Sequence, residues 1–314
     1  MFRRGASIRF TVMRTAPHRS LPASALTSFL AAALVAALSG CSSSSGGGSG
    51  ALGALRHLGA AENAAKQVTY VDTSRVRELS KTDPKRFNHA GQTGSALLNQ
   101  YSGGPWGMSL KVSQIDTAVD SSVSGHWEGH FDADAIIASM KKQGFTSTKQ
   151  RGKEVWKPSG GPGPALVVSA KEITYSTESG NVDAADPSLG ASLADRSDYK
   201  QAAGCLGDVY RADFNPLDTR AAVRLSVLGQ QADSSAKNTE VLCAVVKDQA
   251  TADRLAAKLR AVVTSKAPKY EGTKVTVDKG DHPVVRASVP DSSSQAAGRL
   301  LISDFDLFMA VGAV

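Results

Sequence analysis

Two histidines and one glutamate lie close together in the segment His126-Trp-Glu-Gly-His130. Imidazole and carboxylate groups bind Zn²⁺, and three such ligands suit a zinc site that leaves one position open for catalysis. In a β-strand alternate residues share a face, so His126, Glu128 and His130 would lie side by side. The same alternation is typical of any half-exposed strand. We favour this second interpretation, expect no metal or other cofactor, and keep the three residues as candidate ligands.

The segment differs from the zinc-protease motif His-Glu-x-x-His, in which the glutamate directly follows the first histidine on a helix. The sequence also contains no Gly-x-Ser-x-Gly turn, no phosphate-binding Gly-Lys-Ser/Thr loop and no Gly-x-Gly-x-x-Gly after a strand. Asp304 and Asp306 offer two carboxylates, too few for a Ca²⁺ site. The glycine-rich stretches 102–107 and 159–164 contain proline and are predicted to be loops. We therefore expect a protein that is not an enzyme.

The first 40 residues have the composition of an export signal. Five arginines are the only charged residues before position 41, and the apolar run 23–38 is shorter than the ~20 residues that a membrane-spanning helix needs. The run ends in Leu38-Ser-Gly-Cys41, which resembles the lipobox of bacterial lipoproteins. The resemblance covers this segment alone. It implies that the signal peptide, 1–40, is removed and that the Cys41 thiol carries a diacylglyceryl group. Translation from Met13 would give the same mature chain.

Most of the formal charge of the chain belongs to that signal. Lys and Arg number 36 against 29 Asp and Glu, a net charge of +7, and removal of the five arginines leaves +2. Phosphate neutralisation requires a concentrated basic surface, so a nearly neutral chain argues against a nucleic-acid-binding protein. The 41% hydrophobic and 21% charged residues are typical of a globular protein.

Serine and glycine dominate the residues directly after Cys41 (SSSSGGGSG), a composition that predicts a flexible tether. We place this tether at 41–66. Stable anchoring takes two or more acyl chains, and processing of the lipoprotein type supplies them. No later stretch of the sequence is long and apolar enough to span a membrane. The rest of the chain is therefore predicted to lie on the extracytoplasmic face of the cell membrane, attached to it through covalent lipid.

Two cysteines, Cys205 and Cys243, remain once Cys41 is assigned to lipid. Exported proteins fold where disulfides form, so a Cys205–Cys243 bridge is the simplest interpretation. Closing a loop of this length would stabilise the fold by about 4 kcal/mol in the chain-entropy account. Two buried free thiols are the alternative. Neither cysteine has a neighbouring histidine or belongs to a Cys-x-x-Cys motif, so we do not expect catalytic or zinc-binding cysteines.

Apolar periodicity and turn residues divide the remaining chain into two predicted units, 67–185 and 186–314. Each unit shows two strands, then a helix, then further strands. The predicted strands are 115–123, 124–131, 154–157, 165–169 and 173–177 in the first unit and 221–228, 240–246, 273–277, 284–289 and 307–311 in the second. We therefore expect an α+β fold of two similar halves, each a largely antiparallel sheet with one main helix packed on it.

The main helices are predicted at 132–143, with Asp132 or Asp134 as N-cap, and at 249–263, with Asp248 as N-cap. Together with the later segment SLADRSDYKQAAGCL, the segment GHFDADAIIASMKKQGF resembles uncharacterised secreted and surface-anchored bacterial α+β repeat domains. The resemblance is loose and covers about a third of the chain. It implies the fold and brings no known activity.

These features predict a cell-envelope lipoprotein that acts as a non-enzymatic binding or structural module, with an envelope protein or a small ligand as its partner. Two alternatives remain open. A solute-binding lipoprotein of a transporter would share the anchor and would have two doubly wound lobes with regular strand–helix alternation. A zinc-dependent hydrolase would be built on the face that carries His126, Glu128 and His130.

Overall fold

The computed structural model describes residues 50–314, apart from 96, 99–103, 178–180, 188–189 and 218–220. The predicted signal peptide, Met13, the lipobox with Cys41 and the first residues of the predicted tether therefore lie outside the described residues. Within the described ranges, no helix combines the length and the apolar character needed to cross a membrane.

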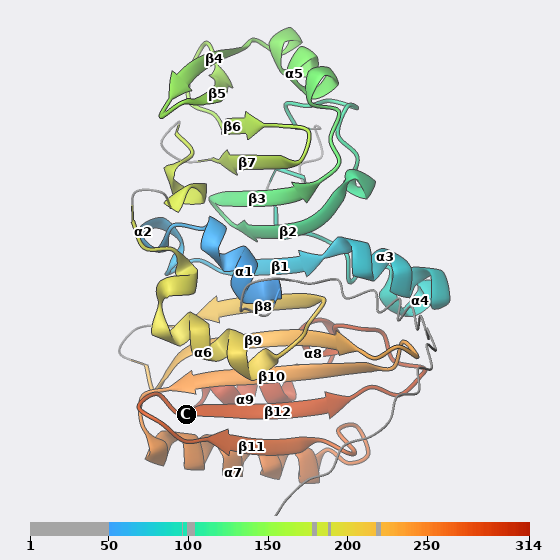
Figure 1. The fold of residues 1–314 in the computed structure, drawn as a ribbon. Helices are drawn as coiled ribbons and strands as arrows, with labels where there is room; N and C mark the ends of the chain where they lie inside the picture. The colour runs from blue at the N-terminus through green and yellow to red at the C-terminus, as the bar shows by residue number, and fades with distance from the viewer. Residues whose placement is uncertain (1–49, 96, 99–103, 178–180, 188–189, 218–220) are drawn as a thin grey trace, which may run out of the picture. The chain divides into compact units, whose positions relative to one another are not determined.

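The strands of the described part form one antiparallel sheet of 12 strands (Figure 1). Its order is β11-β12-β10-β9-β8-β1-β2-β3-β7-β6-β5-β4, and β1 pairs with β8 at the middle. The strands are β1 (Val68–Asp72), β2 (Ile115–Ser121), β3 (Ser124–Gly129), β4 (Phe145–Gln150), β5 (Lys153–Pro158), β6 (Ala165–Val168), β7 (Glu172–Ser176), β8 (Arg211–Pro216), β9 (Val223–Ala232), β10 (Asn238–Val246), β11 (Lys274–Asp278) and β12 (Val284–Pro290).

Helices complete an α+β fold, which confirms the predicted class. The α-helices are α1 (Gly50–Ala54), α2 (Ala60–Asn63), α3 (Thr73–Thr82), α4 (Pro84–Phe87), α5 (Ala133–Lys142), α6 (Ser197–Leu206), α7 (Gln249–Ser265), α8 (Arg299–Ile302) and α9 (Asp306–Gly312). Short 3₁₀-helices are η1 (Leu55–His57), η2 (Val112–Gln114), η3 (Asp183–Ala185) and η5 (Leu193–Asp195).

Helix caps explain where the two main helices begin. The Asp132 carboxylate accepts a hydrogen bond from the backbone N–H of Ala135 at the start of α5, and the Asp248 carboxylate accepts one from Thr251 at the start of α7. Asp248 was predicted as an N-cap, and Asp132 was one of the two candidates for the first helix. The predicted strands 273–277 and 284–289 are also confirmed, because β11 and β12 pair antiparallel there.

Two sequence predictions differ from the structure. Residues 307–311 form the helix α9 and not an edge strand, since Leu307, Ala310 and Val311 bury one helical face. The predicted tether is also too long: α1, η1 and α2 occupy much of 50–66, where Leu55 and Leu58 are fully buried. Burial of these apolar side chains stabilises helices that the serine- and glycine-rich start of the segment does not suggest.

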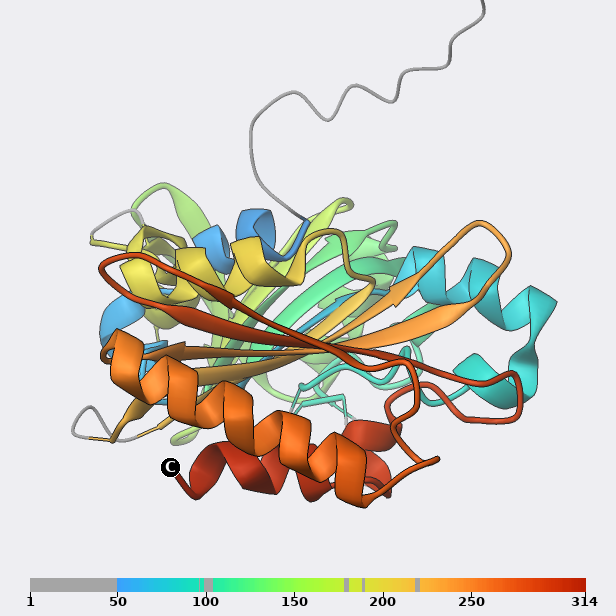
Figure 2. The same ribbon diagram turned by 90° about the horizontal axis from the view of Figure 1, so that it is seen from below.

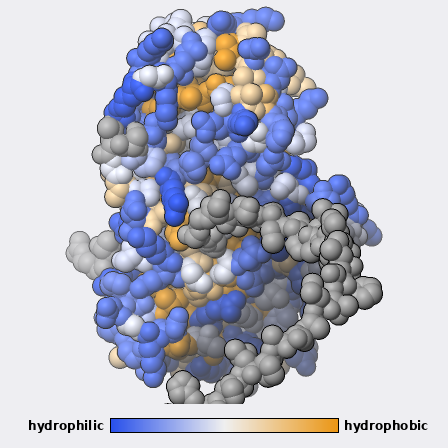
Figure 3. All heavy atoms as spheres, in the orientation of Figure 1, coloured by the Kyte–Doolittle hydropathy of each residue, from blue (hydrophilic) through white to orange (hydrophobic). Residues whose placement is uncertain are grey.

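The sheet is covered on both faces. Helix α6 and the segment α1–η1 pack on one face, here called the α6 face, where Leu55, Tyr199 and Val241 share one hydrophobic core. Helices α7 and α9 pack on the opposite face, here called the α7 face (Figure 2). In the other half of the sheet α5 covers that same α7 face, burying Trp127 beneath Ile136. Hydrophilic residues occupy most of the surface seen from the α6 face (Figure 3).

The predicted disulfide is confirmed. Cys205 on α6 is bonded to Cys243 on β10, with the two Cα atoms 6.3 Å apart, within the range that a disulfide spans. The bond ties the helix to the strand on which it packs and makes the α6 face the crosslinked side of the sheet.

Candidate functional site

His126 and Glu128 lie together on the α6 face of β3, as the strand alternation predicts. Trp127 points to the opposite face, where it is fully buried in the core beneath α5. His130 does not join them, because β3 ends at Gly129 and the chain turns into the cap of α5. The His130 side chain is 90% exposed, with its Nδ1 3.1 Å from the Asp116 carboxylate. The prediction that all three residues share one site is therefore wrong for His130.

A third histidine takes that place. His57, at the end of η1, stacks its ring on that of His126 with the ring centroids 3.8 Å apart and the planes 4° from parallel. His57 was not among the predicted ligands, because its segment was assigned to the tether. The spacing of Ala51, Leu55 and Leu58, which are all fully buried, is the signal that indicates a packed segment there.

Four polar side chains converge at this point, and we call His57, His126, Glu128 and Glu172 the histidine cluster. The Glu128 Oε1 atom lies 3.9 Å from Nε2 of both His57 and His126. Glu172 stands opposite Glu128 in the β3–β7 register and places its Oε2 4.0 Å from Nε2 of His126. One ligand atom each from His57, His126 and Glu128 can be chosen so that all three lie within 4.8 Å of one another.

His126 is the buried centre of the cluster. It is 4% exposed, and its Nδ1 lies 3.0 Å from the hydroxyl of Thr174, its neighbour on β7. The Nε2 atom, which faces the two glutamates, has no hydrogen-bond partner among the described residues. A buried polar atom without a partner loses its hydration without compensation, so this nitrogen marks a place where a further group would be stabilised.

The electrostatics of the cluster favour a charged Glu128 and a neutral His57. The proximity of His126, 3.9 Å away, and a hydrogen bond from the Thr117 hydroxyl lower the pKa of Glu128 to about 2. Burial, together with the neighbouring His126, lowers the pKa of His57 below its usual value of 6.5.

A cavity of about 370 Å³ adjoins the histidine cluster. His57, His126 and Glu128 line it, and the remaining walls come from α1, η1, β1 and β2. Arg56 adds a cation to the lining. The cluster therefore borders a cavity that is open to solvent.

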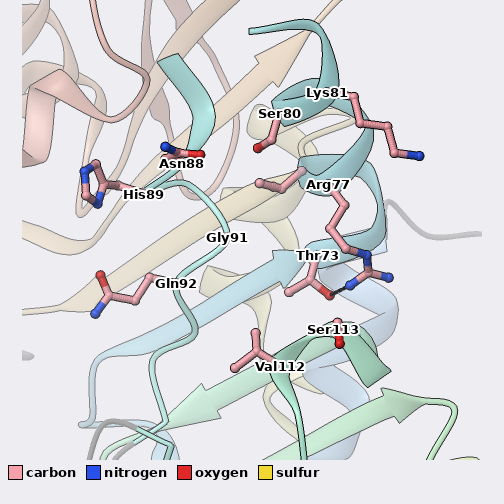
Figure 4. Close-up of a pocket in the computed structure, with 11 residues that line it drawn as sticks. Thr73, Arg77, Ser80, Lys81, Asn88, His89, Gly91, Gln92, Val112 and Ser113 are labelled. Atoms are coloured by element: carbon pink, nitrogen blue, oxygen red, sulfur yellow. Dashed lines mark hydrogen bonds between the residues drawn. The ribbon is translucent and has the colours of Figure 1, made fainter. Parts of the chain in front are cut away.

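A larger cavity, of about 720 Å³, lies elsewhere on the molecule, and we call it the α3 pocket. Figure 4 shows Ser80 and Lys81 of α3 on one side and Asn88 to Gln92 on the other, with η2 below. The Arg77 side chain extends from α3 toward Thr73, and its guanidinium donates a hydrogen bond to Thr73 Oγ1 (Figure 4). The guanidinium also donates a hydrogen bond to the Asp116 carboxylate. The lining residues are Thr73, Val76, Arg77, Ser80, Lys81, Asn88, His89, Gly91, Gln92, Val112 and Ser113, without an acidic side chain among them.

A buried carboxyl lies behind the histidine cluster, on the α7 face of the same strands. Asp120 accepts hydrogen bonds from Trp127 Nε1 at 2.7 Å and from the Tyr175 hydroxyl at 2.8 Å. Burial raises the pKa of Asp120 to about 7, because neither hydrogen bond replaces the hydration that a carboxylate loses.

A second buried polar cluster lies in the other half of the sheet, and we call it the arginine cluster. Arg299 donates hydrogen bonds to Asp291 at 2.7 Å and to Asp304 at 2.6 Å. Asp304 and Asp306, considered above as calcium ligands, are both paired with Lys269. Burial raises the pKa of the nearby Glu240, which accepts a hydrogen bond from the backbone of Leu300. The charged side chains of this cluster therefore form ion pairs with one another inside the fold.

Comparison of the chain with family models, with curated proteins and with solved structures found no match. The functional proposals below therefore rest on the sequence and on the geometry of the chain itself.

Proposed function

We propose that the protein is a lipid-anchored module of the cell envelope that binds a small ligand in the α3 pocket without changing it chemically. The observation that carries the binding role is the α3 pocket itself, whose volume of about 720 Å³ lies in the range of small-molecule sites. Attachment to the extracytoplasmic face of the cell membrane rests on the lipobox residues Leu38 to Cys41.

The chemistry of the lining indicates the class of ligand. Val76 and Val112 offer apolar surface. Arg77 and Lys81 also belong to the lining, and each is paired with a carboxylate outside it, Asp116 and Glu78. An anionic group that took the place of those carboxylates would meet no acidic side chain of the lining itself. The ligand that suits this pocket is a small molecule with an apolar body and one acidic group.

Anilinonaphthalene sulfonate, an apolar fluorescent anion, is a suitable probe for the α3 pocket. We expect it to bind the purified full chain and its fluorescence to rise. Ser80→Trp places an indole in the pocket and should weaken binding at least tenfold. Thr82→Trp is the matched control, because Thr82 lies on the same helix but outside the lining. Equal binding by both variants would contradict the assignment of the pocket.

Lipid attachment is tested by fractionating cells that produce the protein. The wild-type chain should sediment with membranes, and Cys41→Ser should release it into the soluble extracytoplasmic fraction. Ser42→Ala, which leaves the thiol in place, is the control and should remain with membranes. A Cys41→Ser protein that still sediments with membranes would contradict the anchor.

We also infer that the sheet consists of two similar halves. The order β1-β2-β3-β7-β6 outward from the β1–β8 pairing parallels the order β8-β9-β10-β12-β11 on the other side, which supports this inference, while β5 and β4 extend the first half without counterparts. Helices α5 and α7 follow the third strand of each half. In an experimental structure the two sets should superpose with the same connections, and failure to superpose would contradict a common origin.

The alternatives are less well supported. A transporter-feeding solute-binding protein was expected to have two doubly wound lobes, whereas the described strands form one antiparallel sheet. The zinc hydrolase was to be built on His126, Glu128 and His130, and His130 points elsewhere. Non-enzymatic binding remains the function that we propose.

A further inference from the structure

The unpaired nitrogen of His126 is the starting point for a second site, independent of the α3 pocket and of the lipid anchor. If Nδ1 of His126 donates its hydrogen to the Thr174 hydroxyl, Nε2 carries a lone pair directed at the glutamates. An imidazole whose other nitrogen is held by a hydrogen bond is the usual form of a metal-binding histidine. The side chain is therefore oriented as a ligand.

The remaining donor side chains lie close to that lone pair. His57 contributes a second imidazole from η1, while Glu128 and Glu172 contribute carboxylates from β3 and β7. Two carboxylates balance the double charge of a divalent cation. Two nitrogen donors favour a transition metal over Ca²⁺ or Mg²⁺, which prefer oxygen ligands.

The distances among the donors of His57, His126 and Glu128 require only a small contraction, whereas the Glu172 carboxylate, which lies outside that set, has to move further. Zinc bonds of about 2.0–2.1 Å in a tetrahedron place the ligand atoms roughly 3.3 Å apart. Here the contacts from Nε2 of His57 and His126 to Glu128, and from His126 to Glu172, are 3.9–4.0 Å. The side chains of His57, Glu128 and Glu172 are 39%, 56% and 51% exposed, so they have room to move toward the fixed His126.

One change of conformation is needed. Two stacked imidazole rings with parallel planes direct their lone pairs side by side, so His57 has to turn out of the stack for both lone pairs to meet one ion. Its position at the end of the short η1 helix and its partial exposure permit that rotation.

We propose that His57, His126, Glu128 and Glu172 bind one divalent transition-metal ion of the zinc type, with all four positions of a tetrahedron filled by the protein. The ion would link η1, which carries His57, to β3 and β7. Because the protein fills every position, the bound ion stabilises structure and does not activate water. Thr174 is a positioning residue that acts through His126.

Calorimetric titration of the chelator-treated full chain in detergent with Zn²⁺ tests the proposal. We expect one ion per chain. His57→Ala and His126→Ala should each weaken binding by more than about 100-fold, and Thr174→Val by about 10- to 100-fold, as for the loss of an outer partner. His130→Ala is the matched control, a histidine just beyond the same strand whose loss should leave the affinity unchanged.

Several outcomes would overturn the proposal: no zinc binding by the wild-type chain, equal losses in His130→Ala and His57→Ala, or no loss in His57→Ala. His57 is partly exposed, so this variant keeps the test valid even where the buried His126→Ala fails to fold. Substitution with Co²⁺ adds a spectroscopic readout. Intense visible absorption is expected from a tetrahedral ion, and the weak bands of an octahedral ion would contradict four protein ligands.

Discussion

The histidine cluster and the arginine cluster are both buried groups of charged and polar side chains, yet they differ in how these side chains are used. In the arginine cluster the Arg299 guanidinium is 4% exposed and bonds two carboxylates, Asp291 and Asp304. In the histidine cluster the buried His126 uses one ring nitrogen and leaves the other facing two glutamates about 4 Å away. The first cluster joins opposite charges in ion pairs, although Arg299 Nη2 and Glu240 Oε1 also have no hydrogen-bond partner among the described residues. The second cluster joins two carboxylates with two imidazoles and contains no Lys or Arg.

This difference separates residues that serve the stability of the fold from residues that serve binding. Breaking a closed buried ion pair leaves an uncompensated charge, so its residues should matter for stability. Residues of an incomplete cluster should matter little for stability and greatly for binding. The predictions below test that distinction.

Arg299→Met should have the largest effect on stability. Asp291 and Asp304 would lose their buried partner, and the free energy of unfolding should fall by about 3–5 kcal/mol. Denaturation in guanidinium chloride measures the change. Lys81→Met is the control, because the Lys81–Glu78 pair is exposed and should cost less than about 1 kcal/mol. Equal losses of unfolding free energy in the two variants would contradict the greater importance of the buried ion pairs.

Loss of the disulfide should destabilise the α6 face next most strongly. The double variant Cys205→Ser, Cys243→Ser opens a loop with a sequence separation of 38, and the chain-entropy account predicts a loss of roughly 3–4 kcal/mol. Thermal unfolding with and without reductant provides the measurement. The wild-type chain should lose stability on reduction and the variant should not respond, whereas a response from both would point to another cause.

Asp120 should make stability depend on pH. The carboxyl has a pKa of about 7 when folded and 3.8 as its ordinary value, so the folded chain holds the additional proton between these pH values. Stability from this group is greatest below that window and is lost as pH rises toward 7. Between pH 5 and 8 the loss amounts to about 2–3 kcal/mol. Asp120→Asn should flatten this part of the profile, and an unchanged slope in the variant would contradict the assignment.

Substitutions in the histidine cluster should have the smallest effect on stability. His57→Gln and Glu128→Gln alter partly exposed side chains without leaving a buried charge unpaired, so each should change the unfolding free energy by less than about 1 kcal/mol in the absence of metal. Addition of Zn²⁺ should raise the stability of the wild-type chain but not that of His57→Gln. A loss of 3 kcal/mol or more without metal would place this cluster in the same class as the arginine cluster.

Local signals in the sequence were sufficient for several elements. Asp132 and Asp248 indicate where α5 and α7 begin, because an N-cap side chain binds a backbone N–H only two or three residues further along the chain. Strand alternation correctly placed His126 and Glu128 on one face. The short apolar run 307–311 was wrong as a strand, because runs of that length do not separate strand from helix until packing decides.

The rest depends on contacts between residues far apart in the chain. β1 and β8 join the sheet at its centre, and neither was predicted because each is defined by pairing with distant strands. His57 reaches the site only because Leu55 and Leu58 are buried among residues of α6 and β8. The role of His57 follows from tertiary packing and cannot be predicted from the residues next to His126 in the sequence.

Diffraction at the zinc absorption edge from crystals of the zinc-loaded protein tests the central claim most directly. We predict one anomalous peak within bonding distance of Nε2 of His57 and His126 and of a carboxylate oxygen of Glu128, with the two rings no longer stacked. A zinc-loaded crystal that shows no peak there, with the rings still parallel and His126 Nε2 still unliganded, would contradict the account.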